Sequence, residues 1–287
     1  MATSQSHTLG EFLRTFFENL MKEPVREFAA ANGLYFDCFG ERKARKGKKV
    51  TWTDIHGSKH DLDFVLEKGG TDNAVGEPVA FIELAWRRYT KHSKNKVQEI
   101  SGAVNPICQR YEATNPFKGA ILSGQFTENS LNQLKNDDFH VLYIPFDKFV
   151  QAFRKHGLDV YFDENTSEME LERKYAEVSK ESNRPILDGV CADLLKSCRD
   201  EIRQFVSELS FACNRRIRSV SLLPLHGTRV EIPDIDDAIS YVAGYSGLPE
   251  GHRLECIEVI VKYSNDSVIQ CQFMEKREVI DFLNRIR

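Results

Sequence analysis

The sequence predicts an α/β protein, in which a mixed β-sheet flanked by helices is followed by a small α+β module. Three observations predict this arrangement. Apolar residues alternate between helical and strand spacing over residues 9–155, a charged stretch follows at 163–184, and a shorter series of strands and helices fills the remainder. We therefore expect a large domain over residues 1–160, a charged helical connection over 161–186 and the small module over 187–287.

The first predicted element is an amphipathic helix from Leu9 to Ala31, whose apolar residues recur at steps of three and four. Thr8 with Glu11 has the spacing of a capping box, and Asn32-Gly33 is a typical helix end. Pro24 is the point at which this helix could break.

Strands are predicted next. The first three run from Leu34 to Phe39, from Val50 to Ile55 and from His60 to Glu67, with a turn at His56-Gly57. The strongly apolar run from Pro78 to Trp86 is typical of a central strand.

The later elements repeat the alternation of helix and strand. A helix is expected over residues 97–111, and two buried strands, 118–126 and 139–145, are each followed by a helix. The small module contains a helix over 187–212, a strand pair within 218–232, a helix from 236, a hairpin turning at 265–266 and a final helix.

Composition limits the class of protein. The chain has 287 residues, a formal charge of −4 and no apolar run near the ~18 residues that a membrane helix needs. Its first residues lack the pattern of a signal peptide, so we expect a cytoplasmic protein without a membrane partner. The seven cysteines are scattered and include no C-x-x-C pair, which predicts reduced thiols, mostly in the core.

Two carboxylates point to a metal site. The period of two in the strand around Asp63 places Asp61 and Asp63 on one face, and Glu83 is the single carboxylate inside the apolar run. A buried charge costs several kcal/mol unless it is paired. A divalent cation shared by Asp63 and Glu83 would supply the partner, and Mg²⁺ suits one or two carboxylates, with Mn²⁺ as its substitute.

Asp63, the separation of 20 residues to Glu83 on an apolar strand, and the basic helix that follows resemble the PD-(D/E)xK nuclease superfamily. The resemblance covers residues 9–155. It implies a restriction-endonuclease-like fold and Mg²⁺-dependent hydrolysis of DNA, as in many restriction and genome-defence enzymes. It also implies that Asp63 and Glu83 bind the metal and that the carbonyl of Leu84 faces it.

The sequence departs from the family at the motif lysine, whose position holds Ala85. Arg87 on the same strand face could replace it, as could Lys94 or Lys96, which lie about 80° to either side of the apolar stripe of the next helix. We favour Lys94 or Lys96 because a lysine can also assist deprotonation of water. Nucleic-acid contacts are expected from this region at Arg87, Lys91 and Gln98.

A second basic segment, the basic loop from Arg42 to Lys49, carries six cations in eight residues. It is either a solvated loop or an arm that contacts phosphates. The cations in question are Arg42, Lys43, Arg45, Lys46, Lys48 and Lys49.

The sequence is also consistent with other functions and pairings. The sequence has no G-x-S-x-G, Walker lysine or Rossmann glycine motif. Glu83 could instead form a buried salt bridge with Arg87 or Arg88. Ala85 favours the rival function of an inactive nuclease-fold protein that binds DNA or regulates a partner, and RNA is an alternative substrate. Two-fold symmetric DNA would imply a homodimer, and the C-terminal module would serve recognition or dimerisation.

Overall fold

The computed structural model describes residues 5–87, 89–90, 93–225, 227–246 and 254–287. It is an α/β protein with a mixed sheet flanked by helices and a separate antiparallel sheet, as predicted. The chain forms two compact units, which are described separately. Unit 1 comprises Met1–Arg110 and Phe117–Ser210, and unit 2 comprises Tyr111–Pro116 and Phe211–Arg287.

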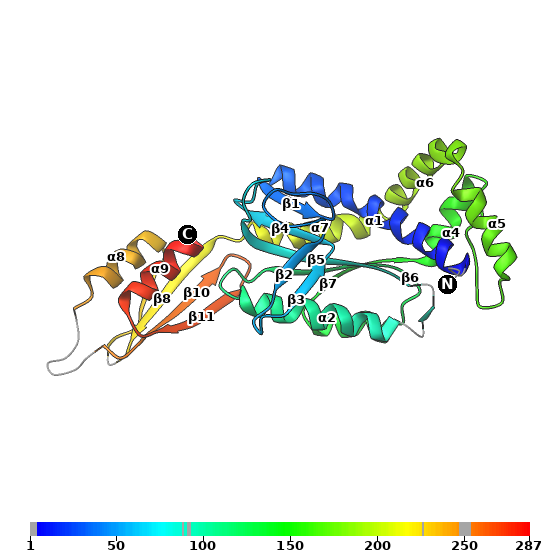
Figure 1. Cartoon of the computed structure of the whole chain (residues 1–287). Coiled ribbons are helices and arrows are strands. Elements are labelled where there is room, and N and C mark those ends of the chain that lie inside the picture. Colours follow the sequence, from blue (N-terminus) through cyan, green and yellow to red (C-terminus); the bar gives the residue numbers. More distant parts are fainter. Residues whose placement is uncertain (1–4, 88, 91–92, 226, 247–253) are drawn as a thin grey trace. The chain divides into compact units, whose positions relative to one another are not determined.

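Unit 1 is built on a five-stranded mixed sheet with the order β1-β4-β5-β6-β7 (Figure 1). The pairs β1/β4 and β4/β5 are antiparallel, whereas β5, β6 and β7 are parallel. The central strand β5 is the apolar run that the sequence predicts. The strands are β1 (Leu34–Cys38), β4 (Phe64–Lys68), β5 (Glu77–Arg87), β6 (Phe117–Gly124) and β7 (His140–Pro145).

A separate hairpin is formed by β2 (Val50–Thr53) and β3 (Lys59–Leu62). The predicted single strand from His60 to Glu67 is therefore wrong, because the chain changes partners at Asp63: β3 pairs with β2, and β4 pairs with β1 and β5. Trp52 of the hairpin packs on Phe81 of β5, with ring centroids 5.4 Å apart. The hairpin thus lies over the face of β5 that carries Phe81 and Glu83.

Helices α1 (Gln5–Ala31) and α2 (Ser93–Arg110) lie on opposite sides of this sheet (Figure 1). Helix α1 continues through Pro24 and ends before Gly33, which has the left-handed φ of 65° that glycine adopts freely. Both helices bury the predicted apolar stripe. The most buried positions are Leu9, Leu13 and Phe17 in α1 and Val97, Ile100, Val104 and Ile107 in α2.

The remaining helices of unit 1 pack on the sheet or on one another. Phe205 contacts Phe117 of β6, with ring centroids 5.5 Å apart, and the buried Trp86 of β5 packs on Phe149 at 5.4 Å. These helices are α3 (Glu128–Asn136), α4 (Phe146–Lys155), α5 (Glu168–Val178), the short 3-10 helix η2 (Glu181–Asn183), α6 (Arg184–Ser197) and α7 (Arg199–Cys213).

The charged stretch is not a connection between domains. Helix α5 buries Leu171 and Val178 and packs against α1, where Tyr175 meets Phe12 edge to face. Residues 161–210 accordingly belong to unit 1, and the division of the chain falls after Ser210 rather than within 161–186. A narrow apolar face is hard to recognise in a helix whose other positions are charged.

Unit 2 has the predicted α+β composition except for the helix expected over 187–212, which is instead two helices, α6 and α7, that begin in unit 1. Its antiparallel sheet has the order β11-β10-β8-β9, and the hairpin turns at Asn265-Asp266, where Asp266 has a φ of 60°. Tyr111–Pro116 joins this unit, since Arg215 donates a hydrogen bond to the carbonyl of Thr114. The elements are β8 (Ile217–Pro224), β9 (Val230–Ile232), α8 (Ile235–Gly244), β10 (Ile257–Tyr263), β11 (Val268–Phe273) and α9 (Lys276–Ile286).

All seven cysteines are free, as expected, but only Cys198 is buried and the other six are half-buried, so the expectation of a mostly core location is wrong. In the part of the chain that the structure describes, no helix has both the length and the apolar character needed to span a bilayer.

Candidate metal centre

The structure brings the carboxylate pair, Asp63 and Glu83, together. Phe64 of β4 lies opposite Ile82 of β5, so Asp63 and Glu83 occupy the next step of the antiparallel register. Asp63 sits at the break between β3 and β4, and its Oδ2 accepts a hydrogen bond of 2.7 Å from the Leu84 amide. The interruption of the strand therefore turns the Asp63 side chain towards β5.

Glu83 is the more buried member, with 7 % of its surface exposed. Its Oε1 has no hydrogen-bond partner among the described residues. Burial, together with the negative charge of Asp63, raises the pKa of Glu83 to about 8. Burial also raises the pKa of Asp63, although the Leu84 amide opposes this rise. Burial and mutual repulsion thus outweigh the nearby positive charge, and the pKa values of both carboxylates stay raised.

The salt bridge between Glu83 and Arg87 is not formed. Arg87 reaches Glu99 instead, at 3.7 Å, and donates to the Trp86 carbonyl at 3.2 Å. Its Nε is itself buried and without a partner in the described structure, and burial lowers the pKa of Arg87. Arg88, the other candidate partner of Glu83, lies outside the described residues.

Lys96 is the candidate lysine whose charge acts on both carboxylates, lowering the pKa of Asp63 and of Glu83. Its side chain is 20 % exposed, and its Nζ lies 3.5 Å from Glu99. Lys94, by contrast, is exposed on α2. The structure thus distinguishes two lysines that the sequence left equivalent.

A third carboxylate, Glu18 of α1, was missed by the sequence analysis. Its negative charge raises the pKa of Asp63, whereas the charge of Arg14 lowers it. Arg14 pairs with both Glu18, at 3.3 Å, and Glu11, at 3.1 Å. In the sequence these three residues have the spacing of an ordinary surface ion-pair ladder, and this spacing hides the relation to Asp63.

Other predicted site residues lie elsewhere. Asp61 does not join Asp63, because it pairs with Lys49 at 2.6 Å and accepts a hydrogen bond from Thr51 in the hairpin. Gln98 is exposed on α2, and Lys91 lies outside the described residues.

The basic loop divides into two sets. Arg42 is buried against Glu67 and Asp37, and Arg45 also turns inward to Asp37, so the prediction that these arginines contact phosphates does not hold. The exposed cations of the loop are Lys43, Lys46, Lys48 and Lys49.

The residues at the carboxylate pair suit Mg²⁺, which takes one or two carboxylates and fills its other positions with water or substrate oxygens. The unpartnered Oε1 of Glu83 is the direct indication, since a buried carboxylate oxygen without a donor is costly. No cluster of three or more histidine, cysteine or acidic residues with a metal-binding arrangement occurs within the described ranges.

Two of the thiols are poorly suited to act as nucleophiles. Burial raises the pKa of Cys108 and of Cys213 to about 12, so both thiols are protonated at neutral pH.

Comparison with known proteins assigns the chain to no family. No family model matches the chain, and no curated protein matches it. A crystal structure of a protein of unknown function, AF1548, is 10 % identical with a TM-score of 0.31, covering 68 % of this chain and 96 % of that one. The function of this chain must therefore be inferred from its own residues.

Proposed function

We propose that the chain is a metal-dependent nuclease whose active centre is the carboxylate pair. One observation carries this proposal. Glu83 is buried beside Asp63, and its Oε1 has no hydrogen-bond partner in the described part of the chain. An enzyme that holds two carboxylates in this state gains a strong affinity for a divalent cation, which supplies the missing positive charge.

Asp63 and Glu83 would hold Mg²⁺, and the Leu84 carbonyl is the third ligand that the family resemblance implies. When bound, the ion supplies polarisation of the phosphoryl oxygen and a more acidic water. The hydrogen bond from the Leu84 amide fixes the orientation of the Asp63 carboxylate. Burial keeps bulk water away from Glu83 and strengthens its interactions.

Lys96 is the residue that we assign to the role of the missing motif lysine. Its charge acts on both carboxylates, and in this proposal it also stabilises the negative charge that develops on a phosphate held there. Ala85 is buried, with 4 % exposure, and its methyl group offers no charge. The cation would thus come from α2 rather than from β5.

DNA is the substrate that we propose, with restriction or genome defence as the setting that the family resemblance implies. Cleavage of both strands would require a homodimer that presents two centres. The rival proposal is an inactive nuclease-fold subunit that binds DNA, which Ala85 favours.

Metal binding provides the first test. Titration calorimetry with Mn²⁺ should detect binding to the wild type and none to Glu83→Gln. Asp61→Asn is the matched control, because Asp61 is a nearby carboxylate that pairs with Lys49 and should leave metal binding intact. Absence of Mn²⁺ binding to the wild type would refute the metal centre.

Cleavage separates the two proposals. Supercoiled plasmid and RNA are incubated with the wild type in Mg²⁺, Mn²⁺ or EDTA. The nuclease should nick DNA only with a metal, and Glu83→Gln should abolish nicking while Asp61→Asn retains it. A wild type that binds Mn²⁺ but cleaves neither DNA nor RNA would favour the inactive subunit.

A further inference from the structure

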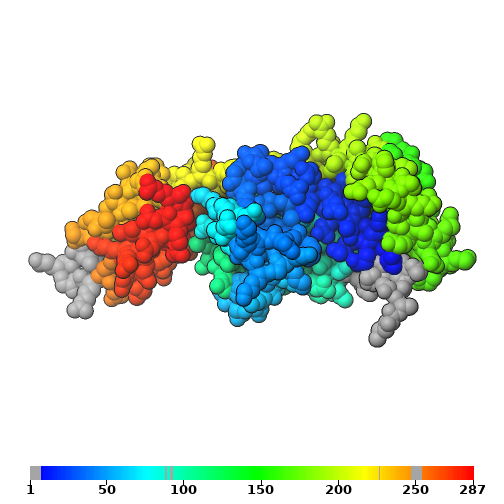
Figure 2. Space-filling model, turned by 45° about the horizontal axis from the view of Figure 1, so that its top comes forward, coloured from blue at the N-terminus to red at the C-terminus, as the bar shows by residue number. Residues whose placement is uncertain are grey.

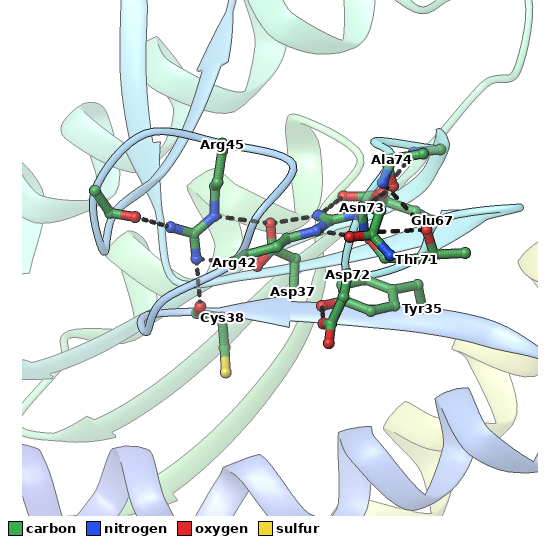
Figure 3. Close-up of polar contacts among 12 residues, drawn as sticks. Tyr35, Asp37, Cys38, Arg42, Arg45, Glu67, Thr71, Asp72, Asn73 and Ala74 are labelled. Atoms are coloured by element: carbon green, nitrogen blue, oxygen red, sulfur yellow. Dashed lines mark hydrogen bonds and ion pairs between the residues drawn. The ribbon is translucent and has the colours of Figure 1, made fainter.

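The buried arginines of the basic loop turn an apparently loose segment into a fixed one. Arg42 has a side chain that is 2 % exposed and forms a two-pronged ion pair with Glu67, at 2.7 and 2.8 Å (Figure 3). It also bonds to Asp37 at 2.7 Å and to the carbonyls of Thr71 and Ala74. These contacts join the loop to β1, β4 and the loop after β4.

Arg45 and the loop backbone complete the attachment. Arg45 donates to Asp37 and to the carbonyls of Cys38 and Gly47 (Figure 3). The Gly40 amide donates to the Lys48 carbonyl at 2.9 Å, and the Ala44 amide to the Asp72 carbonyl at 2.8 Å. The loop is thus held at its ends and at its middle.

The lysines that remain point outward from this framework. Lys43, Lys46 and Lys48 are exposed and form no ion pair with any described residue, whereas Lys49 is partly neutralised by Asp61. This segment, blue in the space-filling view, lies on the surface of unit 1 (Figure 2). These three lysines lack ion-pair partners, and the backbone that carries them is already fixed. An anion that binds them therefore avoids the entropic cost of ordering the loop.

The basic loop runs into the hairpin at the end that lies next to the carboxylate pair. Lys49 directly precedes Val50, which pairs with Leu62, and Leu62 directly precedes Asp63. Lys49 therefore occupies the register position opposite Asp63, and Lys48 comes one residue before it. Lys43 lies further along β4, between Arg42, which pairs with Glu67, and Ala44, which bonds to Asp72. A phosphate chain that places one linkage at Asp63 and Glu83 would have its neighbouring phosphates beside the basic loop.

We infer that Lys43, Lys46 and Lys48 form a preformed contact surface for the phosphate backbone of the nucleic-acid strand that lies across the carboxylate pair, and that Arg42 and Arg45 are positioning residues. This inference rests on the proposed nuclease function. An anionic membrane is the alternative partner, because Phe39 at the start of the loop is 59 % exposed. The adjacent carboxylate pair favours nucleic acid.

The test measures binding to labelled duplex and single-stranded DNA by fluorescence anisotropy in EDTA, over a range of salt concentrations. The triple variant Lys43→Ala, Lys46→Ala, Lys48→Ala should bind at least about tenfold more weakly, and the slope of log K against log salt should fall by about two to three. The matched control replaces Lys22, Lys135 and Lys196, on α1, α3 and α6, and should change both quantities much less.

Arg45→Ala provides a second readout, since it removes one of the attachments of the loop but keeps its lysines. We expect affinity to fall about threefold with the salt slope unchanged, because the same phosphates are contacted by a less ordered loop. A merely structural arginine would leave affinity unchanged in the folded protein.

Equal losses in the triple variant and its control, or no loss in either, would overturn the inference. So would binding to vesicles containing phosphatidylserine without binding to DNA. Because these measurements contain no metal, their failure is distinguishable from failure of the nuclease proposal, which Mn²⁺ titration of the wild type tests separately.

Discussion

Two buried carboxylates of unit 1, Glu67 and Glu83, differ in their hydrogen-bond partners. Glu67 is wholly buried but has a bidentate arginine, whereas Glu83 is nearly as buried and its Oε1 has no hydrogen-bond partner in the described part of the chain. The ion pair of Glu67 holds the fold in place, whereas the unpartnered Oε1 of Glu83 is available to bind a ligand.

Stability should fall as pH rises if Glu83 retains a proton in the folded protein. Its pKa is raised from 4.5 to about 8, so the folded state holds a proton that the unfolded state has lost between these values. In EDTA, we therefore expect the free energy of unfolding to fall by a few kcal/mol from about pH 5 to pH 8. Urea denaturation at several pH values measures this trend.

Glu83→Gln should remove most of that slope, because glutamine does not titrate. Mg²⁺ should reverse the trend, since a bound cation favours the ionised carboxylates. A wild-type slope equal to that of Glu83→Gln would show that Glu83 does not titrate in this range.

Arg42→Ala should be strongly destabilising, by about 3 to 5 kcal/mol, because Glu67 and Asp37 would remain buried without their partner. Urea denaturation gives the value. Lys43→Ala is the control on the same loop and should change stability by less than about 0.5 kcal/mol. A loss of under about 1 kcal/mol in Arg42→Ala would contradict the assignment of a buried anchor.

At the scale of elements, β5 and α2 both contribute to the surroundings of the carboxylate pair. Strand β5 supplies the apolar surroundings that raise the pKa of Glu83, and α2 supplies the cation that acts on both acids. The helix is fixed to the hairpin as well, since the Ile55 amide donates to the Pro106 carbonyl and Arg110 donates to the Asp54 carbonyl.

Within α2, Lys96→Ala should lower metal-dependent cleavage by about 100-fold or more, the range for loss of a group that stabilises transition-state charge. Lys94→Ala is its neighbour control and should retain activity, because Lys94 is exposed and is not among the charges that shift the pKa of either carboxylate. Single-turnover cleavage at saturating Mg²⁺ compares them. Equal activities in the two variants would remove Lys96 from the mechanism.

The positions of the helices and strands could be predicted from the sequence better than the contacts between them. The period of two continues on both sides of Asp63, so nothing in the pattern revealed that the strand breaks there and joins two sheets. Lys94 and Lys96 flank the apolar stripe symmetrically, and their different environments depend on the crossing of α2 over β5. Arg42 resembled its lysine neighbours, because its burial depends on Glu67, 25 residues away.

At the scale of the whole molecule, each unit has a hydrophobic core of its own. The core of unit 2 is formed by one face of its sheet and by α8 and α9, with Leu222, Val259 and Val261 wholly buried. The boundary was misplaced by sequence because the charged positions of α5 outnumber its buried ones. Leu171 and Val178 are what attach it to unit 1.

Because each unit has its own hydrophobic core, we expect unit 1 and unit 2 to unfold independently. Leu222→Ala should destabilise unit 2 by about 2 to 5 kcal/mol, the usual loss for a buried leucine. Calorimetric scans with and without Mn²⁺ should show that the metal still stabilises unit 1 in this variant. A variant that no longer responds to Mn²⁺ would indicate that the two units unfold as one.

The break at Asp63 has a thermodynamic consequence. Asp63 alone separates the hairpin, which follows the lysine-bearing loop, from the strand that pairs with β5 and Glu83, so a ligand that fixes the loop and hairpin also restricts Asp63, the proposed metal ligand. We expect positive cooperativity between polyanion and cation: DNA should lower the Kd for Mn²⁺ by the same factor by which Mn²⁺ lowers the Kd for DNA, as reciprocal linkage requires.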